Sequence, residues 1–290
     1  MRDDMAGATM PVRAIMPWFG SKRTLAPDIV AELGPHRAYW EPFCGGLSVL
    51  LAKPVSSHET VNDLNGDLVN LARVLADDDL APALYGRLSR VLFDERRRDD
   101  SIEALGRPGL SAVDRAFHWF AAGWIGRNGF AGTVGDSAKS FAVRWSPSSS
   151  GGGERFRSAT ESIPAWHHRL RRVTILNRDG FEVMEKIDDV DGVAIYCDPP
   201  YVEKSAEYRH DFDPADHARL AGILRRFKRA RVVVSYYDHP LVRSLYDGWT
   251  FVDRTANKGL HSAGRRGQTG AAAPELLVVN GAPACLDMFA

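Results

Sequence analysis

Short apolar runs alternate along this chain with segments whose apolar residues recur at helical spacing. The run from Val193 to Cys197 has no polar interruption, which is typical of a parallel strand buried on both faces. Similar runs predict strands at 38–41, near 61, and at 173–176, 231–235, 249–252 and 275–279. Helical spacing predicts helices within 22–33, 67–75, 111–124, 213–227 and 241–246. The alternation predicts an α/β fold with a mostly parallel sheet, and the last two strands, with no room for a crossover helix between them, predict an antiparallel edge.

One long segment, from Gly126 to about Trp166, shows neither a strand-like apolar run nor apolar residues at helical spacing, and it is rich in glycine and serine at 146–153. Long connections of this kind inside compact proteins are usually functional or disordered. We interpret it as an insertion that meets a partner. The donors that it offers to phosphates and base edges are Arg127, Asn128, Lys139, Arg144, Arg155 and Arg157, of which we take the first four as candidate DNA contacts. A solvated surface loop explains the same residues with fewer assumptions.

Composition narrows the class of protein. The 290 residues are 44% hydrophobic, without an apolar run long enough to span a bilayer and without a signal peptide, so we expect a globular cytoplasmic protein. The three cysteines are widely spaced and fit no ligand pattern, which predicts neither a disulfide framework nor a metal site. Because the formal net charge is zero, only local basic runs remain as possible phosphate contacts, and we keep 169–172 and 265–266.

The strand at 193–197 is followed directly by Asp198-Pro199-Pro200-Tyr201, at the end of the strand where open α/β sheets bind ligands. Two prolines make a stiff turn with carbonyl oxygens in set directions. The Asp198 carboxylate and the Pro199 carbonyl are a pair of acceptors suited to a planar amino group, and Tyr201 offers a face for stacking a base. The alternative is a strand that ends in an Asp, a Pro-Pro turn and a packed Tyr.

A glycine-rich turn at Gly45 and Gly46 lies between a predicted strand and a predicted helix, with Asp63 about 20 residues downstream, where nucleotide-binding folds hold ribose hydroxyls. No Walker lysine follows the glycines, which favours a ligand without a phosphate chain, and S-adenosylmethionine qualifies. Upstream, Trp18 and Lys22 are close enough in sequence to grip an aromatic ligand that bears a carboxylate. The alternative for Trp18 is packing under a helix.

Asp179 and Phe181 follow the strand at 173–176 and supply an acceptor for an exocyclic amine and an apolar wall, as a purine site requires. Asp179 as a simple helix cap is the alternative. We interpret Cys197 as a small buried hydrophobic residue and not as a nucleophile.

Taken together, these residues resemble the DNA adenine N6-methyltransferases of the Dam type. The matching motifs occur in the family's order over most of the chain: Trp18-Phe19-Gly20-Ser21-Lys22, Glu41-Pro42-Phe43-Cys44-Gly45-Gly46-Leu47-Ser48-Val49, Asn62-Asp63-Leu64-Asn65, Arg127-Asn128-Gly129, Asp198-Pro199-Pro200-Tyr201 and Glu275-Leu276-Leu277. Two departures stand out: the family usually has a third small residue where Leu47 stands, and the insertion matches only at 127–129.

The resemblance implies a Rossmann-like sheet, the cofactor S-adenosylmethionine, double-stranded DNA as partner, and direct methyl transfer to the N6 atom of a flipped-out adenine. It implies that residues 1–76 and 169–290 form the catalytic domain and that 77–168 form an inserted, mainly helical and loop-rich target-recognition region. The catalytic residues would be Asp198, Pro199, Pro200 and Tyr201. Together with the residues reasoned above, the cofactor contacts would be Trp18, Lys22, Pro42, Phe43, Cys44, Gly45, Asp63, Asp179, Phe181 and Asp198.

Two other functions fit the same pattern: an RNA or other amino-group methyltransferase, and a non-catalytic DNA-binding protein that kept the fold. The C-terminal residues Leu286 to Phe289 also resemble the short apolar peptide that docks bacterial proteins on the replication sliding clamp, although Cys285 replaces the usual Gln. A frayed terminus is the simpler interpretation.

Overall fold

The computed structural model describes residues 12–18, 20–126, 141, 151–202, 212–254 and 275–284. The chain divides into two compact units. Unit 1 contains residues 1–23, 44–52 and 59–179, and unit 2 contains residues 24–43, 53–58 and 180–290.

The strands form a seven-stranded sheet in the order β3-β2-β1-β4-β5-β7-β6. Their bounds are β1 Ala38–Glu41, β2 His58–Asn62, β3 Thr174–Leu176, β4 Val193–Cys197, β5 Arg231–Tyr237, β6 Thr250–Asp253 and β7 Glu275–Val279. The pairs β1/β4, β4/β5 and β2/β3 are parallel, whereas β7 is antiparallel to both β5 and β6. The predicted α/β fold with a mostly parallel sheet and an antiparallel edge is therefore confirmed.

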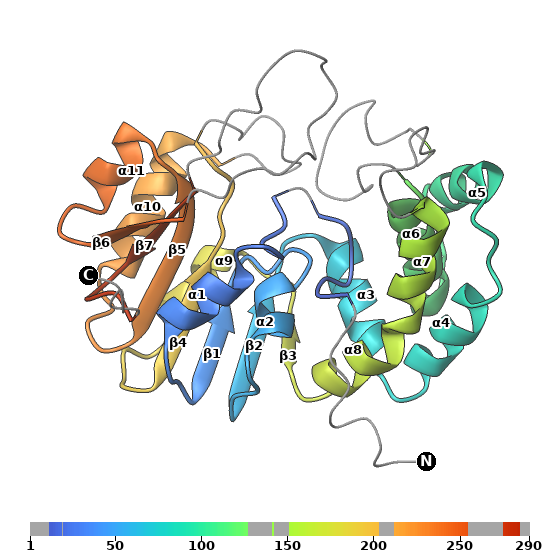
Figure 1. Cartoon of the computed structure of the whole chain (residues 1–290), viewed down its shortest axis with the longest axis horizontal. Helices are drawn as coiled ribbons and strands as arrows, with labels where there is room; N and C mark the ends of the chain where they lie inside the picture. Colours follow the sequence, from blue (N-terminus) through green and yellow to red (C-terminus); the bar gives the residue numbers. More distant parts are fainter. Residues whose placement is uncertain are drawn as a thin grey trace. The chain divides into compact units, whose positions relative to one another are not determined.

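Unit 2 has its core on the strand that the sequence marks as fully apolar. All five residues of β4 are buried, and its side chains alternate between two faces of the sheet. On one face, Ile195 and Cys197 pack in a cluster with Leu220 and Leu224 of α10 (Pro214–Leu224). The helices α9 (Gly180–Glu185) and α11 (Pro240–Leu245) contact α10, whereas α1 (Ala26–Leu33) lies against β4 and β5. Figure 1 shows α1 and α10 on opposite faces of these strands.

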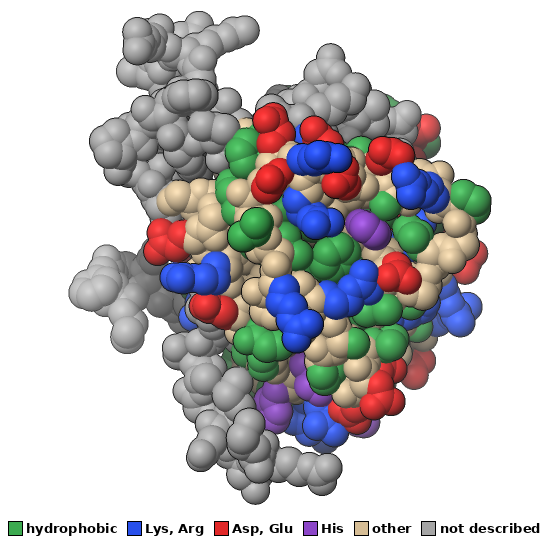
Figure 2. Space-filling view, turned by 90° about the vertical axis from the view of Figure 1, so that its right-hand side faces the viewer, with side chains coloured by type: hydrophobic (Ala, Val, Ile, Leu, Met, Phe, Trp, Pro, Cys, Tyr) green, Lys and Arg blue, Asp and Glu red, His purple; other side chains and the backbone are tan. Residues whose placement is uncertain are grey.

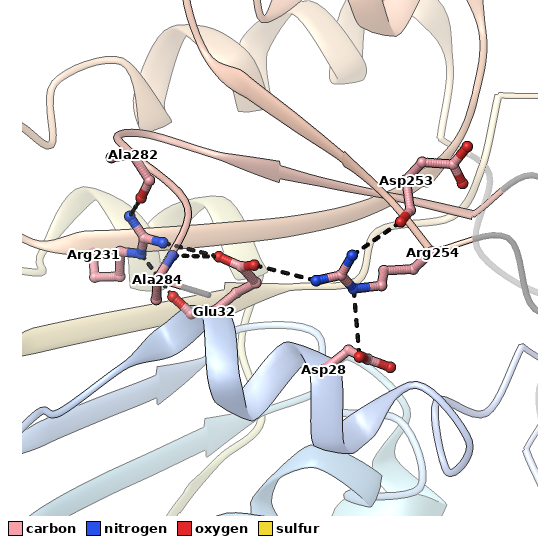
Figure 3. Close-up of polar contacts among 7 residues, drawn as sticks. All are labelled: Asp28, Glu32, Arg231, Asp253, Arg254, Ala282 and Ala284. Atoms are coloured by element: carbon pink, nitrogen blue, oxygen red, sulfur yellow. Dashed lines mark hydrogen bonds and ion pairs between the residues drawn. The ribbon is translucent and has the colours of Figure 1, made fainter. Parts of the chain in front are cut away.

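A buried carboxylate ties α1 to the antiparallel edge of unit 2 (Figure 3). The Glu32 side chain is fully buried, and its Oε2 atom accepts hydrogen bonds from Arg231 Nη2 at 3.2 Å and from the Ala284 amide at 2.9 Å. Arg254 Nη2 lies 3.6 Å from Glu32 Oε1, and Arg254 Nε lies 3.4 Å from Asp28. Burying a carboxylate is costly unless cations and donors surround it, as they do here.

Unit 1 packs helices around α3 and α6 (Figure 1). Their bounds are α2 Ser48–Ala52, α3 Gly66–Ala76, α4 Leu80–Leu88, α5 Glu95–Leu105, α6 Ala112–Ile125, α7 Gly152–Glu161 and α8 Ile163–Leu170. The aromatic stripe of α6 is core: Phe117, Phe120 and Trp124 are all buried, as the spacing predicts. Ser111 caps this helix by accepting a hydrogen bond from the Asp114 amide at 3.2 Å.

None of the helices within the described ranges has the length and hydrophobicity that crossing a membrane requires.

Candidate active site

In unit 2, the residues after β1 and β4 lie at one edge of the sheet. Trp40 is paired with Ile195 in the parallel pair β1/β4, so Pro42 and Phe43 follow one strand where Asp198 follows the other. The chain runs outward from β1 through β2 to β3 and then returns to β4, which places the reversal of strand order between β1 and β4. Open α/β sheets bind their ligands beyond the carboxyl ends of the strands at such a reversal.

The Asp198 side chain is held by β5. Cys197 is paired with Val234, which brings the next residues of the two strands, Asp198 and Ser235, side by side. Ser235 is fully buried, and its hydroxyl donates a hydrogen bond of 2.8 Å to Asp198 Oδ1. The hydroxyl of Tyr196 lies 2.9 Å from Ser235 Oγ. Sequence reasoning missed Ser235, although a lone polar residue near the end of an apolar strand run is a usable signal.

Tyr201 lies in an aromatic cluster. Its ring is 4% exposed, contacts Tyr237 edge-on at 4.5 Å between centroids, and lies 5.8 Å from the Tyr236 ring. Both neighbours come from the end of β5, which extends to Tyr237 and is two residues longer than the predicted strand 231–235. Pairing with β7 as far as Glu275 explains the longer strand.

Three phenylalanines gather at the same edge of unit 2. The Phe181 ring stacks on Phe212 with centroids 5.6 Å apart and an interplanar angle of 16°. Phe43 meets both rings edge-on, at 6.5 Å from Phe181 and 6.2 Å from Phe212. A Cβ atom on Gly180 would lie 2.6 Å from the Phe43 ring, so only glycine permits this approach. Phe212, which the sequence did not reveal, therefore packs directly on the predicted residue Phe181.

Phe212 is in turn held by His217, whose ring meets it edge-on at 4.7 Å between centroids. His217 is buried, and its Nδ1 atom lies 2.8 Å from the Tyr236 hydroxyl. Burial lowers the pKa of His217 to about 4. The imidazole is therefore neutral at neutral pH.

In unit 1, the glycine turn is built around Trp18 and Asp63. Gly45 has φ +44°, and a Cβ atom there would lie 3.0 Å from the Trp18 ring. The Gly45 amide donates a hydrogen bond of 2.9 Å to Asp63 Oδ2, and the Asn65 amide donates one of 2.8 Å to Oδ1. The Cys44 amide donates to the carbonyl oxygen of Asn62 at 2.9 Å. The turn and the acidic loop thus form one hydrogen-bonded unit with the half-buried Trp18 ring against the glycine.

Asparagine side chains brace the loop that carries Asp63. The Asn62 amide exchanges two hydrogen bonds of 2.9 Å with the backbone of Arg178, one as donor and one as acceptor. Asn177 Nδ2 donates to the carbonyl oxygens of Asp63 and Leu64 at 2.8 and 3.2 Å. Asn65 caps α3 by accepting from two amides. The two asparagines of the Asn62-Asp63-Leu64-Asn65 motif thus fix the backbone on either side of Asp63.

Leu47 has φ +63°, and among the described residues it is the only non-glycine with a positive φ. The left-handed conformation costs an ordinary residue about 1–2 kcal/mol. Leu47 is fully buried, and its amide closes the turn on the Cys44 carbonyl oxygen at 2.9 Å. Burial of the leucine side chain offsets the strain at the position where the Dam-type pattern usually has a small residue.

Other predicted site residues differ in exposure. Lys22 is buried, with Nζ 2.6 Å from the Gly20 carbonyl oxygen, whereas Asp179 is exposed. Cys197 is fully buried, and burial followed by the negative charges of Asp198 and Glu41 raises the pKa of its thiol, which is consistent with a packing role. Among the described residues, no group of three or more His, Cys, Asp or Glu side chains could hold a metal ion.

The prediction that the basic run 169–172 contacts phosphate is wrong for Arg169. Arg169 is 6% exposed and forms a bidentate ion pair with buried Glu59, with Nη2 2.8 Å from Oε1. Its Nη2 atom also donates to the Leu50 carbonyl oxygen at 3.1 Å. Arg169 is therefore a structural residue and not a phosphate contact, because the inner face of α8 turns it toward β2.

The helical face of unit 1 carries charges of both signs, as Figure 2 shows. Arg87 pairs with Asp114 at 2.8 Å, and Arg107 pairs with Glu103 at 2.6 Å. The described charges of α4 to α6 thus compensate one another to a large extent. The candidate DNA contacts Arg127, Asn128, Lys139 and Arg144, the basic pair 265–266 and the C-terminal peptide 286–289 lie outside the described residues.

Comparisons with known proteins identify the family of this chain. A family model described as D12 class N6 adenine-specific DNA methyltransferase matches residues 18–104 and 149–260. The chain is 26% identical over 279 residues to the retron Ec67 DNA adenine methylase of Escherichia coli, covering 92% of this chain and 91% of that protein. It is 26% identical over 246 residues to a DNA adenine methylase of Vibrio cholerae, covering 81% and 85%. Among solved structures, the rRNA methyltransferase aviRa from Streptomyces viridochromogenes matches with a TM-score of 0.42 and 14% identity, covering 98% of this chain and 94% of that one. Because the family model covers well over half of the sequence, the chain belongs to the D12 class of N6 adenine-specific DNA methyltransferases.

Proposed function

We propose that this adenine-specific DNA methyltransferase binds S-adenosylmethionine and methylates the N6 amino group of a flipped-out adenine within a specific sequence of double-stranded DNA. The observation that carries the proposal is the placement of Asp198 after β4, at the reversal of strand order, with its carboxylate held by Ser235. A fixed acceptor at this edge is what an exocyclic amino group needs for orientation.

The residues of unit 1 suit S-adenosylmethionine. The Gly45 backbone packs directly against the Trp18 ring, because a Cβ atom there would lie only 3.0 Å from it, and the Gly45 amide donates to the Asp63 carboxylate, so indole and carboxylate are held at the same turn. Ribose hydroxyls are donors, and Asp63 is an acceptor for them. In unit 2, the rings of Phe43, Phe181 and Phe212 suit the adenine ring of S-adenosylmethionine. When bound, S-adenosylmethionine supplies an electrophilic methyl group on a sulfonium centre.

The chain's own part in the reaction is orientation. Asp198 and the Pro199 carbonyl accept the hydrogens of the adenine amino group and so hold the nitrogen lone pair in one direction. Tyr201 is the proposed stacking residue for the extruded base; because it is 4% exposed and packed on Tyr236 and Tyr237, its ring must turn outward to meet that base. No covalent intermediate on the protein is required, which agrees with the burial of the Cys197 thiol.

The proposal extends to the remaining predicted residues. Residues 1–76 and 169–290 act as the catalytic domain, and 77–168 as the target-recognition region that contacts DNA through Arg127, Asn128, Lys139 and Arg144. Lys22, Pro42, Cys44, Asp179 and Pro200 complete the cofactor and catalytic set. A sliding-clamp contact through Leu286 to Phe289 is a separate proposal, and unchanged clamp binding after deletion of 285–290 would dismiss it.

The test is transfer of a labelled methyl group from S-adenosylmethionine to double-stranded DNA, with structured RNA as the competing substrate. We expect Asp198→Ala to abolish transfer to DNA while calorimetry shows at most a partial loss of cofactor binding. Asp247→Ala, an exposed aspartate on the same unit, is the matched control and retains activity. Near-normal turnover by Asp198→Ala would overturn the proposal, and preferential transfer to RNA would favour an RNA methyltransferase.

The recognised DNA sequence follows from sequencing methylated adenines in DNA from cells that express the protein. Methylation at one short motif would support a specific recognition region, whereas methylation without sequence preference would contradict it.

A further inference from the structure

Three polar groups form a buried chain that ends on the catalytic carboxylate. Tyr196 lies on β4 and Ser235 on β5, and the Tyr196 hydroxyl, Ser235 Oγ and Asp198 Oδ1 follow one another at 2.9 and 2.8 Å. Tyr196 is 1% exposed and Ser235 is fully buried. Asp198 directly follows β4 and is two residues from Tyr196, so their side chains project from the same face of the sheet.

The direction of each hydrogen bond follows from proton count. An ionised carboxylate only accepts, so the single proton of the Ser235 hydroxyl is committed to Asp198. The Tyr196 hydroxyl must then donate to Ser235 Oγ. Burial first, and then the negative charge of Asp198, raises the pKa of Tyr196 well above its ordinary value, so this donor keeps its proton at all working pH values.

We infer that Ser235, oriented by Tyr196, is a positioning residue that fixes the rotation of the Asp198 carboxylate for acceptance of the target amino group. The inference rests on the proposed role of Asp198 as that acceptor. Asp198 follows the last residue of β4 and leads into two prolines, so the backbone is stiff, but its side chain can rotate. A donor on the neighbouring strand removes this freedom before the substrate arrives, which is what preorganisation means for an acceptor.

A purely structural role makes a different prediction. If the hydrogen bonds between Tyr196, Ser235 and Asp198 served only to satisfy buried polar atoms, their removal would lower stability and leave the rate of methyl transfer per folded molecule unchanged. A positioning role lowers kcat and leaves the affinity for S-adenosylmethionine intact. The two effects are separable by measuring them on the same variants.

The experiment compares Ser235→Ala, Ser235→Thr and Tyr196→Phe in single-turnover methylation of double-stranded DNA, with cofactor affinity by calorimetry and stability by thermal unfolding. The loss of a hydrogen bond to a charged group predicts that Ser235→Ala lowers the transfer rate about 10- to 100-fold, with the cofactor Kd changed by less than about 2-fold. Ser235→Thr keeps the hydroxyl and restores most of the rate. Tyr196→Phe causes a smaller loss, about 3-fold, because the serine can still donate but is free to turn.

Val232→Ala is the control, because Val232 is fully buried on the same strand, is paired with Ile195 and projects from the face opposite to Ser235. It destabilises β5 from the other face of the sheet, and we expect its transfer rate to stay within about 2-fold of the original. An unchanged rate in Ser235→Ala, or an equal loss in Val232→Ala, would overturn the inference. Activity in Asp198→Ala would instead overturn the proposed function, so the two failures are distinguishable.

Discussion

Substituting Gly45 by alanine tests whether the glycine turn and Trp18 form a cofactor surface. Gly45 has φ +44°, and the added Cβ atom would lie 3.0 Å from Cδ1 and Nε1 of the Trp18 ring. Two costs follow: backbone strain of about 1 kcal/mol at a left-handed position, and displacement of the indole by a few tenths of an ångström. Because stacking on an aromatic ring contributes about 1–3 kcal/mol, we expect the affinity for S-adenosylmethionine to fall about 10-fold.

The chain offers a control that separates the two costs. Gly34 also has a positive φ, +61°, but no heavy atom lies within 4 Å of the position that its Cβ would take. Gly34→Ala should therefore impose backbone strain without a ring contact; with ψ −167° it lies in a region nearly restricted to glycine, so the expected loss of stability is about 1–3 kcal/mol. Its affinity for S-adenosylmethionine should be unchanged.

Calorimetric titration of both variants with S-adenosylmethionine, beside thermal unfolding with and without it, gives the two quantities directly. If Gly45→Ala bound the cofactor as tightly as the unsubstituted protein while both variants lost similar stability, glycine would be required only by the backbone. The assignment of Trp18 to the cofactor site would then be refuted.

Three further predictions concern buried groups. Arg169→Ala removes both guanidinium contacts from the buried Glu59 carboxylate and should lower the free energy of unfolding, measured in urea, by about 3–5 kcal/mol. The double variant Arg169→Met with Glu59→Leu leaves no unpaired charge and should recover most of this loss. A loss below about 1 kcal/mol in Arg169→Ala would contradict the prediction. Burial lowers the pKa of His217 from its ordinary 6.5 to about 4 in the folded protein. As the pH falls from 6.5 to 4, the unfolded chain therefore takes up a proton before the folded protein does. The free energy of unfolding should decline over this window by about 2 kcal/mol, after allowance for solvent screening. His217→Gln should abolish that part of the pH dependence, and an identical slope in the variant would argue against the neutral buried imidazole. Cys197 should react with a thiol reagent only after unfolding, because its thiol is fully buried, and rapid modification of the native protein would show that the β4 edge opens.

The succession of strands along the chain and the helices α1, α3, α6, α10 and α11 could be predicted from the sequence because their cause is local. The helices α4, α5, α7 and α8 were not predicted, and α7 and the first half of α8 correct the interpretation of 126–166 as a segment without periodicity. The apolar run 193–197 is long enough for one buried strand, and Asp213-Pro214 begins α10 with both halves of a capping box. Because parallel strands present their carboxyl ends at one edge, the position of Asp198 in the sequence already placed it at a ligand-binding edge. The family motifs supplied the chemistry of adenine methylation, and the family match bears it out.

Tertiary structure alone decided which side chains surround these motifs. Ser235 contacts Asp198 because β5 is the neighbour of β4 in a register that pairs Cys197 with Val234, and no local pattern fixes either fact. Phe212 joins Phe181 across 30 residues of intervening chain in the same way. The burial of Arg169 depended on the rotation of α8, since a basic run is equally compatible with solvent and with a buried carboxylate. Composition and periodicity describe each segment by itself, whereas register, strand order and helix rotation are set by packing between segments that are distant in the chain.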